Sequence, residues 1–423
     1  MLREPFFEDV IAPVSVHEFF ANYWEKTFLY NARDEPGRFN GLFSLGDVDR
    51  WLLATRSGQP DSILITPPEG SQAWKRKHRP RDLAIDEAYE LFVKGHSLVL
   101  VHLEDSWSPI AGLVSGLGEA FCAEVGVNVY VTPKGSQTFP VHTDDHDVFI
   151  LQVQGEKIWR LHEMTQLSVE RLQYRQDLCL TSDWGKSRVE TPQIAELRLR
   201  PGNVLYIPRG MPHCAVARDE LSLHLTISLR PLSWIDFFKA ALEQASIHAP
   251  ELRKALPPGF LTGPTADEAT HRAFVAALEA FQTHLSFEET HKVVSRSRVR
   301  AFGFPPDGHF EQLASLPDLA LDSMLERRPG ILCTVENSEP NFAHIRFGGQ
   351  NVRVPGRLRK ALEFIRDNPR FQVSQIPDLD DQSRLVLARR LVREGLLRFA
   401  ELHADPEGLF TISGAGSLTT ADR

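Results

Sequence analysis

Histidine and aspartate alternate in the stretch F-P-V-H-T-D-D-H at positions 139–146, and a run of apolar residues follows directly. In an extended segment, residues two apart point to the same side, so His142 and Asp144 can hold one metal ion from one face. Two histidines and one carboxylate are the ligand set of non-haem Fe(II) oxygenases, and this set leaves adjacent positions on the metal open. The pattern therefore predicts an iron site that needs one more histidine.

The missing ligand is predicted from His213 in P-G-N-V-L-Y-I-P-R-G-M-P-H, because a barrel brings distant strand ends together. This spacing suits a double-stranded β-helix. His224 competes for the place, but it sits in mid-strand among apolar neighbours and is expected to support the site or to lie in the core. His146 is expected at the rim of the pocket, on the substrate side. An isolated H-x-D triplet is a weak signal, and its combination with these strands and with a lysine makes it specific.

Iron needs electrons from a co-substrate to activate dioxygen, and 2-oxoglutarate supplies two of them by oxidative decarboxylation. Its distal carboxylate requires a buried cation. Lys157, in G-E-K-I-W, lies among apolar residues on the next expected strand, where a charged group needs a partner of opposite charge. The alternative is a surface lysine whose stem covers apolar neighbours while its ammonium stays in water.

The elements that position these residues are short β-type runs between about 97 and 230, a pattern typical of an all-β sandwich or barrel. Two helices are expected between 15 and about 56, with Ser15 and Ser44 as N-caps. Pro201, Gly202 and Asn203 predict a tight turn between two strands. Amphipathic helices follow Pro231, separated by a Pro- and Gly-rich break at 257–264. Strands and helices alternate again from about 331, and no internal repeat is apparent.

The composition is that of a soluble globular protein of two or three domains, with 423 residues and a net charge of −9. This charge argues against a nucleic-acid or membrane binder as a whole. Residues 341–400 are the exception, since they hold 12 Arg and Lys against 6 Asp and Glu, a local charge of +6. These basic residues predict either a nucleic-acid contact or ordinary solvated helix faces. A cytoplasmic location is expected, because there is no signal-like apolar segment and the four cysteines form no C-x-x-C pair: Cys122, Cys179, Cys214 and Cys333.

The segments N-V-Y-V-T-P-K-G-S-Q-T-F-P-V-H-T-D-D-H-D-V-F-I-L-Q-V-Q-G-E-K-I-W and P-G-N-V-L-Y-I-P-R-G-M-P-H-C-A-V-A-R-D-E-L-S-L-H-L-T-I-S-L together resemble the JmjC-type cupin oxygenases. The resemblance is to their ribosomal oxygenase branch and is strong over about residues 100–232. It implies a mainly β catalytic core, the JmjC cupin barrel, with a helical segment and a C-terminal winged-helix-like α+β module. The implied domains are a catalytic domain with lead-in helices (1–232), a helical dimerisation segment (233–330), a winged-helix-like domain (331–412) and a polar tail (413–423).

Carried over by position, the resemblance implies that His142, Asp144 and His213 bind Fe(II) and that Lys157 pairs with the far carboxylate of 2-oxoglutarate. It also implies three softer assignments around the co-substrate and substrate pocket: Asn128, Tyr130 and Ser228. The implied activity is a 2-oxoglutarate-dependent dioxygenase that hydroxylates a protein or peptide side chain, such as an arginine or histidine of a ribosomal protein. A homodimer is implied as well.

Several other functions fit the same residues. The barrel could act on a peptide natural-product precursor or on a modified tRNA base, and oxidation of an N-methyl group would make it a demethylase. A non-catalytic cupin that serves as a binding module is the alternative from another class. The complete set of metal ligands and the lysine argue against that last function.

Overall fold

The computed structural model divides the chain into two compact units, residues 4–298 and 299–423, which are described separately. This division does not test the four domain boundaries predicted above. The structure describes residues 7–55, 63–67, 76–78, 85–164, 191–257, 260, 268–301, 308–328, 331–339 and 341–400. Cys179 and the predicted tail at 413–423 lie outside these ranges. Across the described part of the chain, no helix combines the length and the apolar character needed to cross a membrane.

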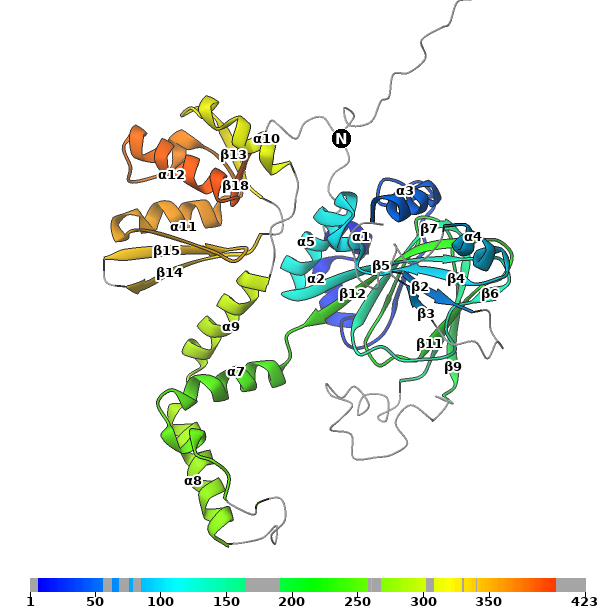
Figure 1. Cartoon of the computed structure of the whole chain (residues 1–423), viewed down its shortest axis with the longest axis horizontal. Helices are drawn as coiled ribbons and strands as arrows, with labels where there is room; N and C mark the ends of the chain where they lie inside the picture. The colour runs from blue at the N-terminus through cyan, green and yellow to red at the C-terminus, as the bar shows by residue number, and fades with distance from the viewer. Residues whose placement is uncertain are drawn as a thin grey trace, which may run out of the picture. The chain divides into compact units, whose positions relative to one another are not determined.

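The first unit is built on two antiparallel sheets, which Figure 1 shows wrapped together. The larger sheet has the order β1-β10-β7-β12-β5-β4-β2-β3 and the smaller one the order β6-β11-β8-β9. The strands of the larger sheet are β1 Leu29–Asn31, β2 Ile63–Thr66, β3 Arg76–His78, β4 Ser97–Leu100, β5 Ala123–Thr132, β7 Asp147–Gly155, β10 Val204–Ile207 and β12 Ser222–Pro231. Those of the smaller sheet are β6 Ser136–Gln137, β8 Lys157–His162, β9 Gln193–Leu199 and β11 His213–Ala217.

Every strand predicted between 97 and 230 is confirmed. The turn predicted at Pro201–Asn203 joins β9 to β10, and Gly202 adopts a φ of +87° there. A side chain at this position would collide with the backbone of Glu35, since a Cβ would lie 2.2 Å from its carbonyl oxygen. Glycine is therefore required at this turn both by its conformation and by the close approach of a neighbouring segment.

Helices cover one side of the larger sheet and extend the core. Phe19 and Phe149 belong to an aromatic cluster that joins this N-terminal layer to the sheet. The predicted cap at Ser15 is confirmed, because its Oγ accepts a hydrogen bond from the backbone N–H of Glu18 at 3.1 Å. Ser44 directly precedes α3, as predicted, and its N–H and Oγ donate to the carboxylate of Asp47 at 2.9 and 2.7 Å; its role as an acceptor for the helix stays a prediction. The helices of this layer are α1 Phe7–Ile11, α2 Val16–Asn22, α3 Leu45–Thr55, α4 Ile85–Val93 and α5 Ala111–Phe121, of which α1, α4 and α5 were not predicted.

The helical segment after the barrel contains α7 Trp234–Ser246, α8 Glu268–His284 and α9 Phe287–Ala301. Ser233 and Asp236 form a capping box that starts α7 where β12 has ended. No residue of α8 is buried in the single chain. This observation leaves an amphipathic helix of 17 residues with an uncovered apolar face.

The second unit has an α+β composition, as predicted, with a core of its own. Two three-stranded sheets, β17-β13-β18 and β14-β15-β16, pack with helices. The winged-helix assignment itself stays a prediction. The helices are α10 His309–Ala314, α11 Arg359–Asp367 and α12 Asp381–Arg393; the strands are β13 Met324–Arg327, β14 Cys333–Glu339, β15 Phe342–Phe347, β16 Gln350–Pro355, β17 Arg370–Gln372 and β18 Leu397–Phe399.

Candidate metal and co-substrate site

The two sheets enclose a cavity of about 410 Å³, including its open mouth. Its walls come from β5, β7 and β12 of the larger sheet and from β8 and β11 of the smaller one. The predicted metal ligands His142, Asp144 and His213 all line it. One ligand atom from each of these three residues lies within 4.8 Å of the others. The structure therefore brings these three residues together, although His142 and His213 are 71 positions apart in the sequence.

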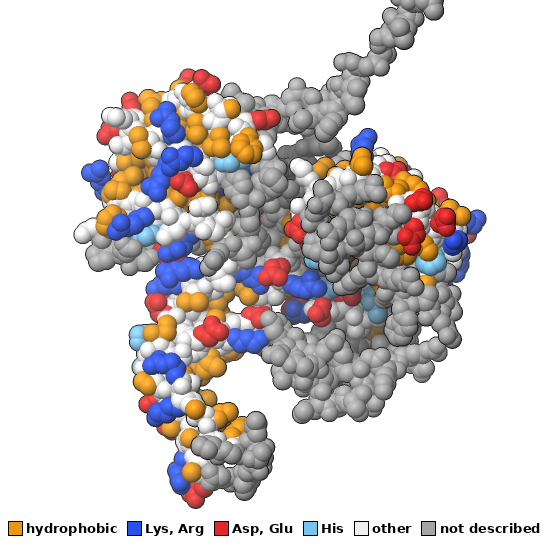
Figure 2. Space-filling model, viewed as in Figure 1, with side chains coloured by type: hydrophobic (Ala, Val, Ile, Leu, Met, Phe, Trp, Pro, Cys, Tyr) orange, Lys and Arg blue, Asp and Glu red, His pale blue; other side chains and the backbone are white. Residues whose placement is uncertain are grey.

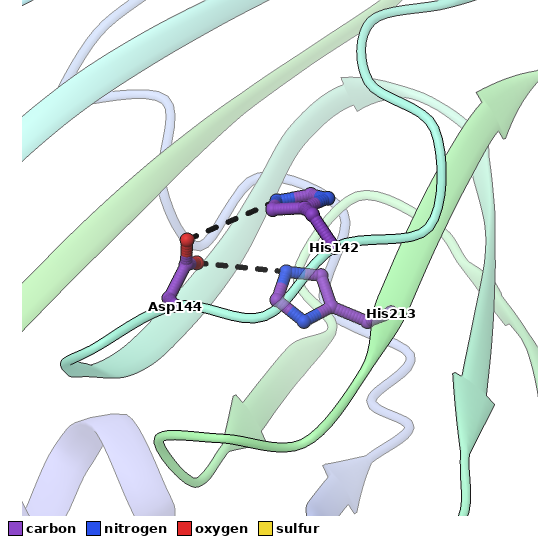
Figure 3. A group of neighbouring side chains, drawn as sticks. All are labelled: His142, Asp144 and His213. Carbon is purple, nitrogen blue, oxygen red and sulfur yellow. Dashed lines mark ion pairs between the residues drawn. The ribbon is translucent and has the colours of Figure 1, made fainter. Parts of the chain in front are cut away.

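Backbone pairing holds the two histidines side by side. The N–H of His142 donates to the carbonyl of His213 at 3.0 Å, and the N–H of His213 donates back at 2.8 Å. Asp144 is fixed in turn, because its carbonyl accepts from the N–H of Gly210 at 2.9 Å. Figure 3 shows the carboxylate of Asp144 facing both imidazole rings. Its oxygens lie 3.9 Å from Nε2 of His142 and 3.6 Å from Nε2 of His213.

The tautomers of the two histidines follow from their other contacts. Nδ1 of His142 lies 2.9 Å from the carbonyl oxygen of Pro140, and Nδ1 of His213 lies 2.9 Å from that of Met211. A carbonyl can only accept, so each Nδ1 carries the proton and each Nε2 presents a lone pair. This backbone support is the arrangement that orients metal-bound histidines. The donor set fits a divalent metal of the iron type.

The pKa values of His213 and Asp144 favour metal binding. Burial and the neighbouring His142 together lower the pKa of His213 to about 4, although Asp144 opposes them, so its imidazole is neutral at physiological pH. Burial pushes the pKa of Asp144 upward, but His213 and His142 outweigh this and hold the pKa below its usual value. The result is an ionised carboxylate beside neutral imidazole, the protonation state that metal binding requires.

Lys157 lies deeper in the same cavity and is only 2 % exposed. Its Nζ donates to Oγ1 of Thr132 at 3.0 Å. Within the described ranges no carboxylate lies at ion-pair distance from it, and burial lowers its pKa to about 7. A buried ammonium with a single hydroxyl partner is unfavourable unless an anion joins it. This cavity thus fits an anionic ligand that reaches from the metal ligands to Lys157.

The softer assignments differ in where the structure places them. Tyr130 lines the cavity, and its ring stacks on His224 at 4.9 Å. Asn128 accepts from the backbone N–H of His102 at 3.2 Å, and Ser228 donates to the carbonyl of Gly126 at 3.1 Å. Neither of the latter two belongs to the cavity lining. All three assignments stay predictions, and only Tyr130 has a position that supports it.

His224 lines the cavity without joining the metal ligands. His146 does not line it, and its Nδ1 lies 2.8 Å from Asp145. Sequence reasoning missed the contact of Thr132 with Lys157 and the cavity positions of Thr138, Phe139, Trp159 and Thr226. The alternation of side chains along a strand could have predicted two of these residues, Thr132 and Trp159. Thr132 is two residues from Tyr130 on β5, and Trp159 is two residues from Lys157 on β8.

Comparison with known proteins places this geometry in a family. Residues 111–237 match the JmjC domain family. This part of the chain is thus similar to a JmjC domain. This domain contains all three candidate metal ligands and Lys157, so the resemblance drawn from the motifs is confirmed.

Among curated proteins, ribosomal oxygenase 1 of Rattus norvegicus is 32 % identical to this chain over 263 residues, which are 60 % of this chain and 42 % of the relative. The chain is 31 % identical to the bifunctional lysine-specific demethylase and histidyl-hydroxylase NO66 of Aedes aegypti over 255 residues, 59 % of this chain and 39 % of that protein. The matched part thus spans less than half the length of these relatives.

Among solved structures, the ribosomal oxygenase YcfD of Escherichia coli, in complex with cobalt and 2-oxoglutarate, superimposes with a TM-score of 0.56 at 18 % identity. The match covers 92 % of this chain and 99 % of the bacterial one. At this identity the likeness establishes the fold. It confirms the JmjC cupin architecture predicted for the catalytic core.

Proposed function

We propose that the JmjC domain is an Fe(II)- and 2-oxoglutarate-dependent dioxygenase that hydroxylates a protein side chain, with a ribosomal protein arginine or histidine as the substrate. The observation that carries this proposal is the cavity itself. It places three candidate metal ligands beside a buried lysine that has no carboxylate at ion-pair distance among the described residues. The names of the relatives, ribosomal oxygenase and histidyl-hydroxylase, support the substrate class.

Each residue has a defined task in this proposal. His142, Asp144 and His213 hold the iron through two Nε2 atoms and a carboxylate. Lys157 pairs with the distal carboxylate of the 2-oxo acid, while Thr132 keeps the ammonium in place. When bound, the iron and 2-oxoglutarate together supply dioxygen activation, which inserts one oxygen atom into a C–H bond and yields succinate and carbon dioxide. The apolar walls Val148, Ile150 and Trp159 exclude bulk water from the reacting groups.

The proposal is tested by mass spectrometry of candidate ribosomal proteins after incubation with the protein, iron, ascorbate and 2-oxoglutarate. We expect one peptide to gain the mass of a single oxygen atom, with an equal amount of succinate. The Asp144→Ala variant is the control and should give neither product. Succinate formation that no tested protein stimulates would redirect the search to peptide precursors or tRNA, whereas no turnover with any substrate would favour a binding module.

Demethylation is a second candidate, because one relative is named a lysine-specific demethylase as well as a histidyl-hydroxylase. Oxidation of an N-methyl carbon gives an unstable product that releases formaldehyde. The same incubation distinguishes the two activities, since a methylated lysine peptide would lose the mass of a methylene group. The cavity is equally compatible with both, and the hydroxylase is preferred because both groups of relatives carry an oxygenase name.

We propose further that two copies of the chain associate through the helical segment of α7 and α8. Trp234 and Phe274 are 69 % and 62 % exposed, and Phe238, Leu242 and Leu278 are also exposed on these helices. Figure 2 shows hydrophobic side chains along this segment. An apolar face of this extent calls for a partner. A second copy is the natural occupant, because closed homodimers are the commonest assemblies.

The proposed location is the cytoplasm. Cys122, Cys214 and Cys333 are free thiols in the described part of the chain, which is expected in a reducing compartment.

A further inference from the structure

Positive charge is concentrated in one part of the chain. Residues 341–400 carry +6, and the whole chain carries −9, so everything outside this segment carries −15. The segment contains β15, β16, α11 and α12 of the second unit. Figure 2 shows several of its Lys and Arg side chains on the visible face. Such an asymmetry within a single chain indicates a surface with its own anionic partner.

Most of these basic residues are occupied by neighbouring acids. Ion pairs of 2.6–3.1 Å join Arg359 to Glu363, Lys360 to Asp378, Arg366 to Asp367, and Arg384 to Asp381. These pairs lie around α11 and the start of α12, where acids balance the charge. This part of the unit is therefore an ordinary solvated surface, which is one of the two alternatives predicted for residues 341–400.

The second half of α12 differs. Leu387, Ala388, Leu391 and Val392 are buried, while Arg389 and Arg393 are exposed on the opposite side of the helix. Val386, one turn earlier, is 58 % exposed. No acidic residue occurs between Asp381 at the start of the helix and Glu394 just after its end, where Glu394 lies 3.2 Å from Arg393. The outer side of these turns thus carries more arginine than acid.

A hydrogen bond connects the outer side of α12 to the neighbouring sheet. Arg390 donates through Nη1 to the carbonyl of Arg353 at 3.1 Å, which brings α12 into contact with β16 at this residue. β16 is an edge strand of its sheet, and this hydrogen bond caps one of its unpaired carbonyls. Arg353 is exposed, and its guanidinium lies 3.4 Å from the centre of the Phe342 ring. We call the set Arg353, Arg389, Arg390 and Arg393 the arginine face.

The geometry points to RNA as the partner of this face. Guanidinium groups bind phosphate oxygens through paired N–H donors, which suits a phosphodiester backbone better than scattered carboxylates. The guanidinium of Arg353, which lies over the ring of Phe342, offers a flat surface on which an unpaired base can stack. The exposed side chain of Val386 offers a second, apolar contact surface. We propose that the arginine face binds single-stranded or loop RNA. This inference does not depend on the chemistry proposed for the JmjC domain.

The test measures fluorescence anisotropy of a labelled RNA stem-loop titrated with the full chain, at salt concentrations from about 50 to 200 mM. The double variant Arg389→Gln/Arg393→Gln should weaken binding roughly tenfold or more, and should lower the slope of log affinity against log salt by about one to two. Arg389→Lys/Arg393→Lys should recover the salt slope. The matched control is Arg359→Gln/Arg366→Gln, which removes the same charge from α11, where both arginines are paired with acids, and should change affinity less than about threefold. Arg393 is paired with Glu394 as well, so the contrast between the two variants rests on Arg389, which has no ion pair among the described residues.

Four outcomes would overturn the proposal. The wild type could fail to bind the RNA at the lowest salt, or both double variants could weaken binding equally, which would mean that net charge alone decides. Poly-glutamate could compete as well as RNA does, and the partner would then be an acidic protein. A duplex DNA of the same sequence is included, and tighter binding to it than to RNA would also contradict the proposal. Thermal unfolding of each variant confirms that the unit stays folded.

Discussion

Lys157 offers the sharpest test of the cavity, because its burial gives it an unusual titration. The side chain has one hydrogen-bond partner at 3.0 Å, and its pKa is lowered from 10.5 to about 7 by burial. Without a ligand, the ammonium is therefore only half protonated near neutral pH. A carboxylate ligand pairs with the protonated form alone, so its binding must raise the pKa and take up a proton.

The expected magnitude follows from this pKa. The apparent dissociation constant for 2-oxoglutarate should rise about tenfold per pH unit above pH 7, and should level off below it. Proton uptake on binding should be roughly one half at pH 7 and about nine tenths at pH 8. This pKa shift affects the free energy of unfolding in the opposite direction to a salt bridge, because it makes the folded state less stable. The lowered pKa of Lys157 destabilises the free protein fully below pH 7, and this penalty fades as the pH rises toward 10.5.

The assay is isothermal titration calorimetry of the Mn(II)-loaded protein between pH 6.5 and 8.5 in buffers with different ionisation enthalpies, which separates proton uptake from binding. Lys157→Met should abolish the uptake and raise the dissociation constant, and with it the KM for 2-oxoglutarate, by roughly tenfold or more. 2-Oxopentanoate, which has the same chain without the distal carboxylate, is the control ligand and should bind without uptake.

Flat affinity and no proton uptake in the wild type would refute this reasoning. The anion partner would then be sought elsewhere. Arg160 on β8 and Arg230 on β12 are other cations of the barrel, but the structure argues against both. Arg160 lies 2.9 Å from Glu196, Arg230 lies 3.7 Å from Asp145, and neither lines the cavity.

Three further perturbations test other parts of the molecule. Asp144→Ala should lower Co(II) affinity by about a hundredfold or more in an absorbance titration, since it removes the charged ligand, and a wild-type affinity would contradict the metal assignment. Phe274→Glu/Phe281→Glu should convert a dimer into a monomer of lower Tm by light scattering and thermal unfolding, and a wild type that is already a monomer at micromolar concentration would refute association through these helices. His224→Phe should weaken 2-oxoglutarate but not 2-oxopentanoate, because the buried Nδ1 of His224 has no hydrogen-bond partner within the described ranges; an equal loss for both ligands would instead indicate a packing role.

The metal ligands could be predicted from sequence because each depends on local geometry. The parity of an extended segment places His142 and Asp144 on one side, and a strand followed by a turn carries His213 to the same end of the barrel. The strands were predicted for the same reason, since alternation and turn residues are local signals. The helices α4 and α5 were missed, although α5 packs on the larger sheet and several of its residues belong to the core.

Contacts across the barrel could not be predicted in this way. Lys157 on β8 meets Thr132 on β5, which belongs to the other sheet, so this hydrogen bond depends on how the two sheets face each other. Ser228 is a further case. It shares a face of β12 with His224 and Thr226, which line the cavity, but it lies opposite Gly126, where the missing side chain leaves room for its hydroxyl to reach the backbone.

The surroundings of the charged residues decide how the two proposed anion sites should differ. Lys157 is the one lysine among the described residues that lines the cavity, and it is buried. The low dielectric of the cavity therefore strengthens its interaction with a carboxylate, and salt should change this interaction little. The arginine face is exposed, so each of its contacts is weak and its strength lies in number, which makes it steeply dependent on salt. Raising the salt concentration should therefore release RNA while 2-oxoglutarate stays bound. Loss of both ligands at the same salt concentration would mean that one of the two sites has been assigned to the wrong kind of environment.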